Sequence, residues 1–326
     1  MSEAVIGLDL GGTRVRAARL SHDLEILQRH ETLTEDERGL DATLDLIKAM
    51  IREVLPQDGT PVAGIGVSAP GPLNPNTGVI VAPPNLKGWH NVALGDILRQ
   101  EFGLSVYVGN DANVAGLAET VRGAALGFRH VIFITISTGI GSGIICDGKM
   151  LLGKDGLAAE TGHVIILAGD QPSTLEKEAA GPALARKARA RIEKGEKSLI
   201  YDVVKGDLDQ ISGATVGHAA QQGDALALDI VRYAGRIIGL GMVSLLHLFN
   251  PQILVFGGGV SMLGDLLFDP MREAIRMYCI DSAYWSDLRI EPAALGENVS
   301  LIGAASLVVT RGGVVDVAEV VAKLKL

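Results

Sequence analysis

The sequence predicts an α/β protein of two domains, and two segments and one bulk property support this prediction. Residues 5–20 read as two short strands around a glycine turn, because apolar residues alternate with small ones on both sides of Gly11 and Gly12. Residues 131–148 repeat the arrangement, with an apolar strand, a turn rich in Gly, Ser and Thr, and a second apolar strand. At 326 residues, 41 of them glycine, the chain is long enough for two tightly turned domains.

The first glycine turn is a candidate phosphate-binding loop. Gly11 and Gly12 leave backbone N–H groups unobstructed by side chains, so a phosphate could approach them closely. Asp9 ends the first strand, where its carboxylate could hold a magnesium ion or a water bound to that ion. An ordinary buried hairpin with Asp9 as a turn former explains the same residues, since short motifs give many false matches.

The repetition of the hairpin favours nucleotide binding over the ordinary hairpin. The second turn contains Ser137, Thr138, Gly139, Gly141 and Gly143. Two phosphate-loop hairpins in one chain suggest two related halves that face one nucleotide.

Composition and charge narrow the class of protein. The net charge is −9, from 29 basic and 38 acidic residues, so we do not expect a nucleic-acid-binding surface. Cys146 and Cys279 are too few for a disulfide framework and are typical of a reduced cytoplasm. The N-terminus lacks the pattern of a signal peptide, and residues 240–249, the most apolar stretch, are too short for a membrane span. We therefore expect a cytoplasmic protein without a membrane partner.

The segment after the first hairpin predicts a helix, a strand and a rigid loop. Residues 39–55 carry leucine and isoleucine at helical spacing, and residues 62–68 read as a short apolar strand. A proline- and glycine-rich loop follows, A-P-G-P-L-N-P-N-T-G. Loops at the carboxyl ends of strands are common binding positions in α/β sheets. Gly71 lies in this loop and Asn85 lies in the segment V-I-V-A-P-P-N-L-K-G-W that follows it, and both residues suit ordinary turns.

A strand at residues 106–108 leads into G-N-D-A-N and then into a predicted helix. Asn110 or Asp111 could simply cap that helix. A carboxylate at this position could also act as a base and accept a proton from a bound group.

The second half of the chain is predicted to be mainly helical. Helical patterns cover residues 182–194, 215–223 and 225–246, and the basic residues of the first read as a solvated face rather than an anion site. A buried strand at 253–256 runs into three glycines, and residues 301–309 read as a helix. Residues 314–326 suggest a further helix or a frayed tail.

Five motifs in a fixed order resemble those of the ROK family of sugar kinases, in the actin-like ATPase superfamily. They are D-L-G-G-T, A-P-G-P-L-N, G-N-D-A-N, S-T-G-I-G-S-G with E-T-G-H, and F-G-G-G, and the resemblance covers residues 4–311. It implies an actin-like (ribonuclease H-like) two-domain fold with mixed sheets and an interdomain cleft. We expect a smaller domain of residues 1–118 plus 300–326 and a larger one of residues 119–299, which close on the sugar about a hinge near residues 115–125.

The resemblance also implies roles for individual residues. Asp111 would be the catalytic base, and Asp9 would organise Mg²⁺, most simply through water. The implied sugar-binding residues are Gly71, Asn85, Asn110, Asp111, Glu160, His163 and Glu176. The implied ATP-binding residues are Asp9, Gly11, Gly12, Thr13, Arg14, Thr138, Gly139, Gly257, Gly258 and Gly259.

The chain departs from the family pattern at two places. In many relatives the histidine of E-x-G-H ligates zinc together with cysteines just downstream, but residues 164–176 contain no cysteine. A structural zinc site needs about four N or S ligands, so we expect no zinc. Glu176 matches the family's sugar-binding glutamate after the zinc run, with Glu178 as the alternative equivalent. Arg14 stands where relatives usually have lysine, and both are cationic.

The resemblance therefore predicts an ATP- and Mg²⁺-dependent hexose kinase that is a homodimer. Glucose O6 is the first candidate acceptor, and N-acetylmannosamine, fructose, mannose and allose remain open, as does polyphosphate in place of ATP. ROK repressors carry a DNA-binding segment ahead of the first hairpin. This hairpin begins at residue 5, so we expect an enzyme rather than a repressor. A non-catalytic sugar sensor would be expected to lack the base, whereas Asp111 is present together with both phosphate hairpins.

Overall fold

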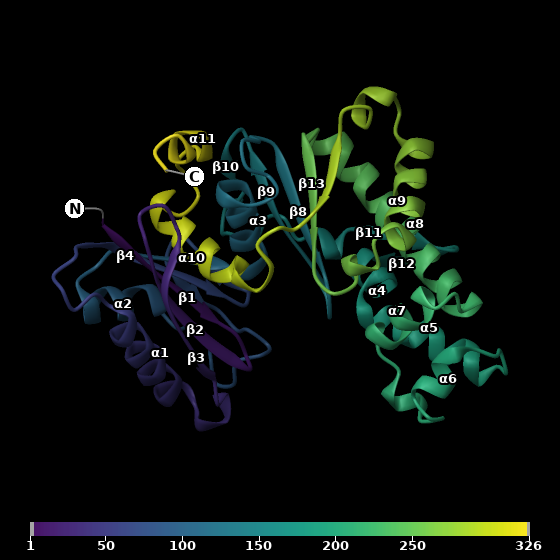
Figure 1. Ribbon diagram of the computed structural model, residues 1–326, viewed down its shortest axis with the longest axis horizontal. Coiled ribbons are helices and arrows are strands. Elements are labelled where there is room, and N and C mark those ends of the chain that lie inside the picture. The colour runs from purple at the N-terminus through teal and green to yellow at the C-terminus, as the bar shows by residue number, and fades with distance from the viewer. Residues whose placement is uncertain (1–2, 325–326) are drawn as a thin grey trace. The chain divides into compact units, whose positions relative to one another are not determined.

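The computed structural model describes residues 3–324 and shows a mixed α/β protein (Figure 1). The chain divides into two compact units. Unit 1 contains the chain up to Phe133, Gly143–Ala159 and the part from Ala293 onward, and unit 2 contains Ile134–Ser142 and Glu160–Pro292. The domain boundaries expected from the sequence, 118/119 and 299/300, remain a prediction.

Unit 1 is organised on a five-stranded mixed sheet with the strand order β3-β2-β1-β4-β7. The predicted glycine-turn hairpin forms β1 and β2, which pair antiparallel, whereas β1, β4 and β7 run parallel to one another. The strands are β1 (Ala4–Leu10), β2 (Arg14–Leu20), β3 (Ile26–Leu33), β4 (Val62–Ala69) and β7 (Val106–Asn110).

Helices α1 (Leu40–Val54) and α2 (Leu94–Phe102) complete the core on one face of this sheet (Figure 1). Successive side chains of a strand point to opposite faces, so Ile6, Leu8 and Leu10 of β1 share one face. They are buried in one cluster with apolar residues of both helices. The helix predicted over residues 39–55 is therefore confirmed.

Helix α10 (Val299–Val309) packs on the opposite face so closely that its backbone touches the backbone of the strands. A Cβ on Gly66 would lie 1.7 Å from the carbonyl oxygen of Ala304, and one on Gly7 would lie 2.6 Å from that of Leu301. Gly303 has the same relation to α3 (Asp111–Arg122), at 2.3 Å from the Val114 carbonyl oxygen. Glycine is required at all three positions because any side chain would separate the layers.

A buried carboxylate fixes the segment that leads into α10. Glu119 of α3 is fully buried, and its carboxylate accepts hydrogen bonds from the backbone N–H groups of Ala294 and Leu295 at 3.0 Å. It also accepts one from Ala124 at 2.8 Å. A buried charge needs such donors to replace water. Glu119 therefore ties the end of α3 to the returning chain.

A second five-stranded sheet has the order β10-β9-β8-β13-β14. Strands β8 and β9 form the second predicted hairpin, and both contribute residues to each unit. The strands are β8 (Val131–Ile136), β9 (Ile140–Cys146), β10 (Lys149–Met150), β13 (Ile253–Gly257) and β14 (Arg289–Pro292).

Unit 2 is otherwise mainly helical, and its longest helix, α8 (Ala225–Phe249), packs closely on α9 (Asp265–Tyr278). A Cβ on Gly235 would lie 2.3 Å from the Leu267 carbonyl oxygen, and one on Gly239 would lie 2.6 Å from that of Met271. The two glycines therefore allow the backbones of α8 and α9 to approach closely. Asn250, in the left-handed conformation before Pro251, ends α8.

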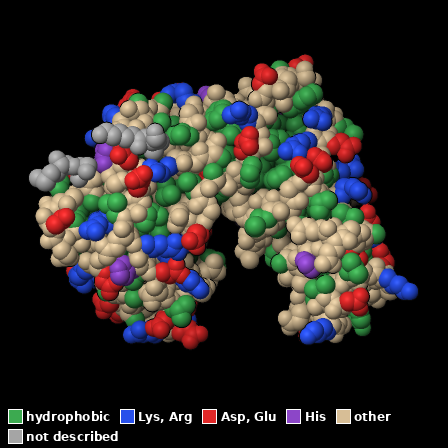
Figure 2. Space-filling model, viewed as in Figure 1, with side chains coloured by type: hydrophobic (Ala, Val, Ile, Leu, Met, Phe, Trp, Pro, Cys, Tyr) green, Lys and Arg blue, Asp and Glu red, His purple; other side chains and the backbone are tan. Residues whose placement is uncertain are grey.

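The remaining elements of residues 3–324 are one further long helix, α5, and several short strands, helices and turns. They are β5 (Leu73–Asn74), β6 (Val79–Ile80), β11 (Ile165–Ala168), β12 (Gln171–Thr174), α4 (Leu175–Ala179), α5 (Gly181–Glu193), α6 (Leu199–Val203), α7 (Gly213–Gln221), α11 (Val317–Val321) and six 3₁₀ turns. No helix within residues 3–324 is long and apolar enough to cross a membrane. Acidic and basic side chains are interspersed on the face that Figure 2 shows.

We predict that Gly66→Ala destabilises the protein by about 1–3 kcal/mol, because the new methyl group would overlap the α10 backbone. Urea unfolding followed by circular dichroism measures the change. Gly59→Ala is the control, since Gly59 has φ +81 and open space around it and so reports backbone strain without a clash. A Gly66 variant as stable as the parent protein would contradict the close packing of α10.

Candidate functional site

The candidate residues of unit 1 gather where its three parallel strands end. In the strand register, Asp9 of β1 lies opposite Ser68 of β4, and Ala69 of β4 lies opposite Asn110 of β7. Asp111 follows directly, at the start of α3. The carboxyl edge of a parallel sheet is the usual location of a binding site in this class of fold. The structure therefore brings Asp9, Asn110 and Asp111 to one edge.

The carboxylate of Asp9 is held by an arginine that the sequence did not single out. Arg16 lies opposite Asp9 on β2 and donates two hydrogen bonds to Asp9 Oδ2, from Nε at 2.9 Å and from Nη2 at 2.5 Å. Both side chains are largely buried, at 13% exposure for Asp9 and 19% for Arg16. No local motif marks this pair, because it depends on the register of the hairpin.

The loops around this edge also bring predicted residues together. Gly12 lies against Asn85, since a Cβ on Gly12 would be 2.5 Å from the Asn85 carbonyl oxygen. Gly71 lies against the amide of Asn110, with 3.0 Å from its Cβ position to Nδ2. The first contact joins a predicted ATP-binding residue, Gly12, to a predicted sugar-binding residue, Asn85, and the second joins two predicted sugar-binding residues.

The first glycine turn is closed by its own backbone. Gly11 donates to the carbonyl of Arg14 at 2.9 Å, and the carbonyl of Thr13 accepts from Thr34 at the same distance. Arg14 forms an exposed ion pair with Glu31 of β3.

Asn110 caps α3, as one of the two interpretations of G-N-D-A-N proposed. Its side-chain oxygen accepts from the backbone N–H of Ala112 at 3.1 Å and of Asn113 at 3.5 Å. Asp111 is exposed, and its Oδ1 accepts from Ala112 at 2.8 Å. A carboxylate held at a helix N-terminus and open to solvent can receive a proton from a bound hydroxyl.

In unit 2 the second glycine turn consists of Ser137, Thr138 and Gly139, closed by a hydrogen bond from Ser137 to the Gly139 carbonyl at 2.8 Å. Gly141 and Gly143, which we assigned to this turn, lie within β9 instead. A Cβ on Gly143 would be 2.8 Å from the Ala112 carbonyl oxygen, so Gly143 serves the packing of β9 on α3.

Glu176, rather than Glu178, lies beside this turn. Glu176 Oε2 accepts from the backbone N–H of Ile140 at 2.9 Å and would be 2.6 Å from a Cβ on Gly139. Glu178 is buried away from it, with Lys187, Ser173 and Tyr233 as hydrogen-bond partners at 2.5, 2.9 and 3.0 Å. The position of Glu176 suits its predicted role better than that of Glu178 does.

The E-T-G-H segment lies against the start of β9. Thr161–His163 forms a 3₁₀ turn, and a Cβ on Gly162 would be 2.1 Å from the Ile140 carbonyl oxygen. Glu160 and His163 flank this buried glycine and are both exposed. Ile140 therefore contacts the E-T-G-H turn through its carbonyl and Glu176 through its N–H.

A cavity of about 830 Å³ opens beside the second turn, within unit 2. Its size matches the range typical of small-molecule and cofactor sites. Thr138 and Gly259 line it, whereas Gly257 lies within β13 and Gly258 (φ +83) packs against the backbone of Ile136. The other lining residues are Ser137, Gly181, Pro182, Ala185, Arg186, Arg189, Ile211, Ser212, Gly213, Ala214, Gly217, His218, Gln221, Val260, Met262 and Leu263.

Sequence reasoning missed the contribution of α5 and α7 to this cavity. Arg186 and Arg189 line it, although we interpreted the basic residues of α5 as a solvated face. Arg189 forms an ion pair with Asp209 at 2.8 Å, and Arg186 donates to the Lys177 carbonyl at 2.5 Å. The repeat of basic residues along one helix was the available signal.

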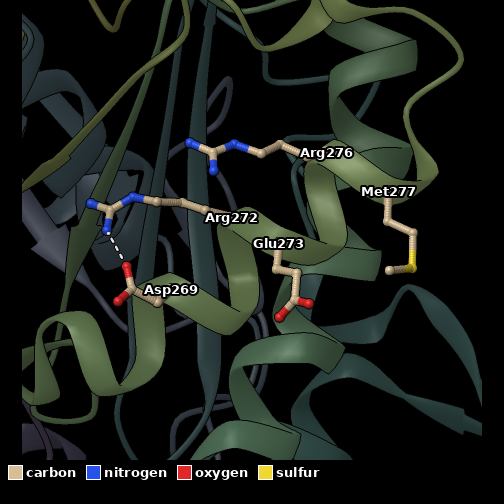
Figure 3. Close-up of a pocket in the computed structure, with 5 residues that line it drawn as sticks. All are labelled: Asp269, Arg272, Glu273, Arg276 and Met277. Carbon is tan, nitrogen blue, oxygen red and sulfur yellow. Dashed lines mark hydrogen bonds and ion pairs between the residues drawn. The ribbon is translucent and has the colours of Figure 1, made fainter.

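A shallower hollow on α9 holds none of the predicted site residues (Figure 3). Arg272 and Arg276 extend from successive turns of the helix to the same side. Arg272 is paired with Asp265 at 2.9 Å and with Asp269 at 3.0 Å. Because one helix supplies the whole lining and Arg272 is paired with two aspartates of that helix, we do not assign a function to this hollow.

The described residues include no group of three or more His, Cys, Asp or Glu side chains placed to hold a metal ion. His163 lies next to the β11–β12 hairpin, which occupies the part of the chain where many relatives have zinc-binding cysteines. Whether the protein carries zinc remains a prediction from the sequence.

A model of the ROK family matches residues 5–311. This chain belongs to the ROK family. The glucokinase of Thermotoga maritima is 33% identical over 315 residues, which cover 95% of this chain and 98% of that protein. The crystal structure of a ROK family glucokinase from Streptomyces griseus, in complex with glucose and AMPPNP, matches with a TM-score of 0.75 at 33% identity and covers 93% of this chain and 98% of that one.

A transcriptional repressor is also similar to this chain. A xylose repressor of Caldicellulosiruptor bescii is 27% identical over 319 residues, which cover 94% of this chain and 78% of the repressor. Membership of the ROK family and the mixed α/β, actin-like fold are thus confirmed for this member.

We predict that Tyr233→Phe lowers the free energy of unfolding by about 1 kcal/mol at neutral pH, because it removes the hydrogen bond to Glu178. Burial and the Glu178 carboxylate together raise the pKa of Tyr233 to about 12. A raised pKa in the folded state stabilises the protein below the ordinary tyrosine pKa of about 10. The parent protein should lose this advantage as the pH rises from about 10 to 12.

Urea unfolding of both proteins between neutral pH and pH 12 measures this difference. Tyr201→Phe, at an exposed position on α6, is the matched control. A constant difference between Tyr233→Phe and the parent across this range would contradict the coupling of Tyr233 to Glu178.

Proposed function

We propose that this protein is a cytoplasmic, ATP-dependent hexose kinase that transfers the γ-phosphate of ATP to a sugar hydroxyl, with glucose O6 as the preferred acceptor. The observation that carries the proposal is the exposed carboxylate of Asp111 at the strand edge that also holds Asp9 and Asn110. Similarity to glucokinases over nearly the whole chain supports it.

Asp111 accepts the proton of the attacking hydroxyl in this proposal, and Asn110 binds the sugar. Phosphoryl transfer depends mainly on positioning and on stabilising charge, so one well-placed carboxylate is the base that it needs. Asn110 is already oriented by its bonds to the start of α3. The further sugar contacts that we propose are Gly71, Asn85, Glu160, His163 and Glu176.

The cavity in unit 2 is the site that we propose for the nucleoside of ATP. Ile211, Met262 and Leu263 offer an apolar lining that suits a flat base. Polyphosphate, the alternative donor, has no group that would use such a surface. Phosphates would contact Thr138 and Gly139 of the second turn and Gly11, Gly12 and Thr13 of the first. Of the three predicted glycines at the end of β13, Gly259 would lie beside the nucleoside, whereas Gly257 lies within the strand and Gly258 packs on Ile136.

The surroundings of Asp9 fit the Mg²⁺ ion that this reaction implies. Mg²⁺ usually binds one or two carboxylates and keeps several waters and phosphate oxygens, so a cluster of protein ligands is not required. The hydroxyl of Ser68, opposite Asp9 in the register, is fully buried and has no hydrogen-bond partner among the described residues. It can bond a water in that hydration shell. When bound, Mg²⁺ neutralises charge on the phosphates.

A sugar-responsive regulator is the second candidate function, because a xylose repressor is similar along most of the chain. The two functions differ in turnover. A coupled assay for ADP release distinguishes a kinase from a regulator. The protein is incubated with ATP, Mg²⁺ and, in turn, glucose, mannose, fructose, allose and N-acetylmannosamine. A regulator would bind a sugar without releasing ADP. We also propose a homodimer, as the family resemblance implies.

We predict that Asp111→Asn lowers kcat by about 10²- to 10⁴-fold, since the amide cannot accept the proton of the sugar hydroxyl. Sugar affinity, measured by calorimetry, should stay close to that of the parent protein. Asp45→Asn, an exposed aspartate on α1, is the control for the change of charge. Activity within a few-fold of the parent would remove Asp111 from the catalytic role.

We predict that the purified protein holds no stoichiometric zinc, because residues 164–176 offer no cysteine. Elemental analysis tests this directly. The melting temperature should not change on adding a chelator once magnesium has been restored. One zinc per chain would reveal a ligand set that the sequence does not suggest.

A further inference from the structure

We propose that Arg16 is a positioning residue that holds the Asp9 carboxylate in the orientation needed for Mg²⁺-bound ATP, an inference that rests on the proposed function. Two of the hydrogen bonds of Arg16, from Nε and Nη2, go to the same oxygen, Asp9 Oδ2. Oδ1 receives neither bond. The carboxylate is thus held by one oxygen while the other is left to act on a hydrated metal ion.

The arginine is itself held in place by the backbone. A third hydrogen bond, from Nη1, goes to the carbonyl of Glu297 at 2.8 Å, in the turn just before α10. The planar guanidinium presents its donors in a fixed geometry, so anchoring one nitrogen orients the others. The position of the Asp9 carboxylate therefore depends, through Arg16, on the position of the returning C-terminal segment.

Burial explains why Asp9 needs this partner. Its side chain is 13% exposed, so water cannot fully solvate the charge, and without Arg16 the carboxylate would be poorly compensated. Outer partners that hydrogen-bond a metal-binding carboxylate typically change metal affinity or activity by about 10- to 100-fold when they are replaced. We expect Arg16 to act at this scale.

Arg29 offers a matched control on the neighbouring strand. It bonds the side chains of Glu297 at 3.2 Å and Asn298 at 3.1 Å, so it anchors the same turn without contacting Asp9. Replacing Arg29 weakens the attachment of this turn and leaves the bonds to Asp9 intact. Replacing Arg16 weakens that attachment and also removes the two bonds that orient Asp9.

The experiment measures the binding of MgATP by calorimetry in the absence of sugar, for R16A, R16K, R29A, D9N and the double variant R16A/D9N. We expect R16A to raise the Kd for MgATP by about 10-fold or more. R16K should recover only part of the loss, because an ammonium group restores charge but not the two-point contact. R29A should bind as the parent protein does.

The double variant distinguishes positioning from a general structural role. If Arg16 acts through Asp9, replacing it in the D9N background should cost little more than D9N alone. An equal loss in both backgrounds, an equal loss in R29A, or tighter MgATP binding by R16A would each overturn the inference. If MgATP binding follows the expected pattern while no sugar releases ADP, the inference stands and the proposed kinase function falls. A parent protein that does not bind MgATP would overturn both.

Discussion

Unit 1 depends on one constraint, the direct contact between the backbone of α10 and the backbone of the first sheet. Gly7 and Gly66 leave no side chain between the strands and the carbonyls of Leu301 and Ala304. This contact brings the chain from Ala293 onward back to strands that were formed at the start of the sequence. The buried carboxylate of Glu119 and the guanidinium of Arg16 then bond the backbone of that segment, at residues 294–295 and 297. The position of Asp9 thus depends on packing between the two ends of the chain.

Unit 2 builds its candidate site from backbone contacts in a similar way. The carbonyl of Ile136 accepts from Val260 at 3.0 Å, and that of Ser137 accepts from Gly181 at 2.8 Å. These bonds join the second glycine turn to the segment after β13 and to the start of α5. The turn therefore has little freedom of its own, and the cavity lies where the three segments meet. A turn that is already fixed in this way needs little rearrangement when a ligand binds beside it.

The sequence predicted most of the regular elements because their apolar periodicity is local. The hairpin around Gly11, the helix α8 that ends at Asn250 and the cap at Asn110 follow from residues within a few positions of each other. It assigned Gly141 and Gly143 to a turn because glycine is common in turns, whereas these residues serve packing in a strand. Charge alone likewise did not reveal that Arg186 and Arg189 of α5 border a cavity, because the sequence does not show which cavity a helix lines.

The sequence by itself determined the family, the order of the motifs and the residue types available for chemistry, because five spaced motifs together are far more specific than any one of them. Only the tertiary structure decided which polar groups meet. The pairing of Arg16 with Asp9 depends on strand register, the bonds of Glu119 depend on a segment 175 residues away, and the lining of the cavity depends on helices α5 and α7. Periodicity reports which face of an element is buried, whereas the identity of the partner on that face is set by the path of the whole chain.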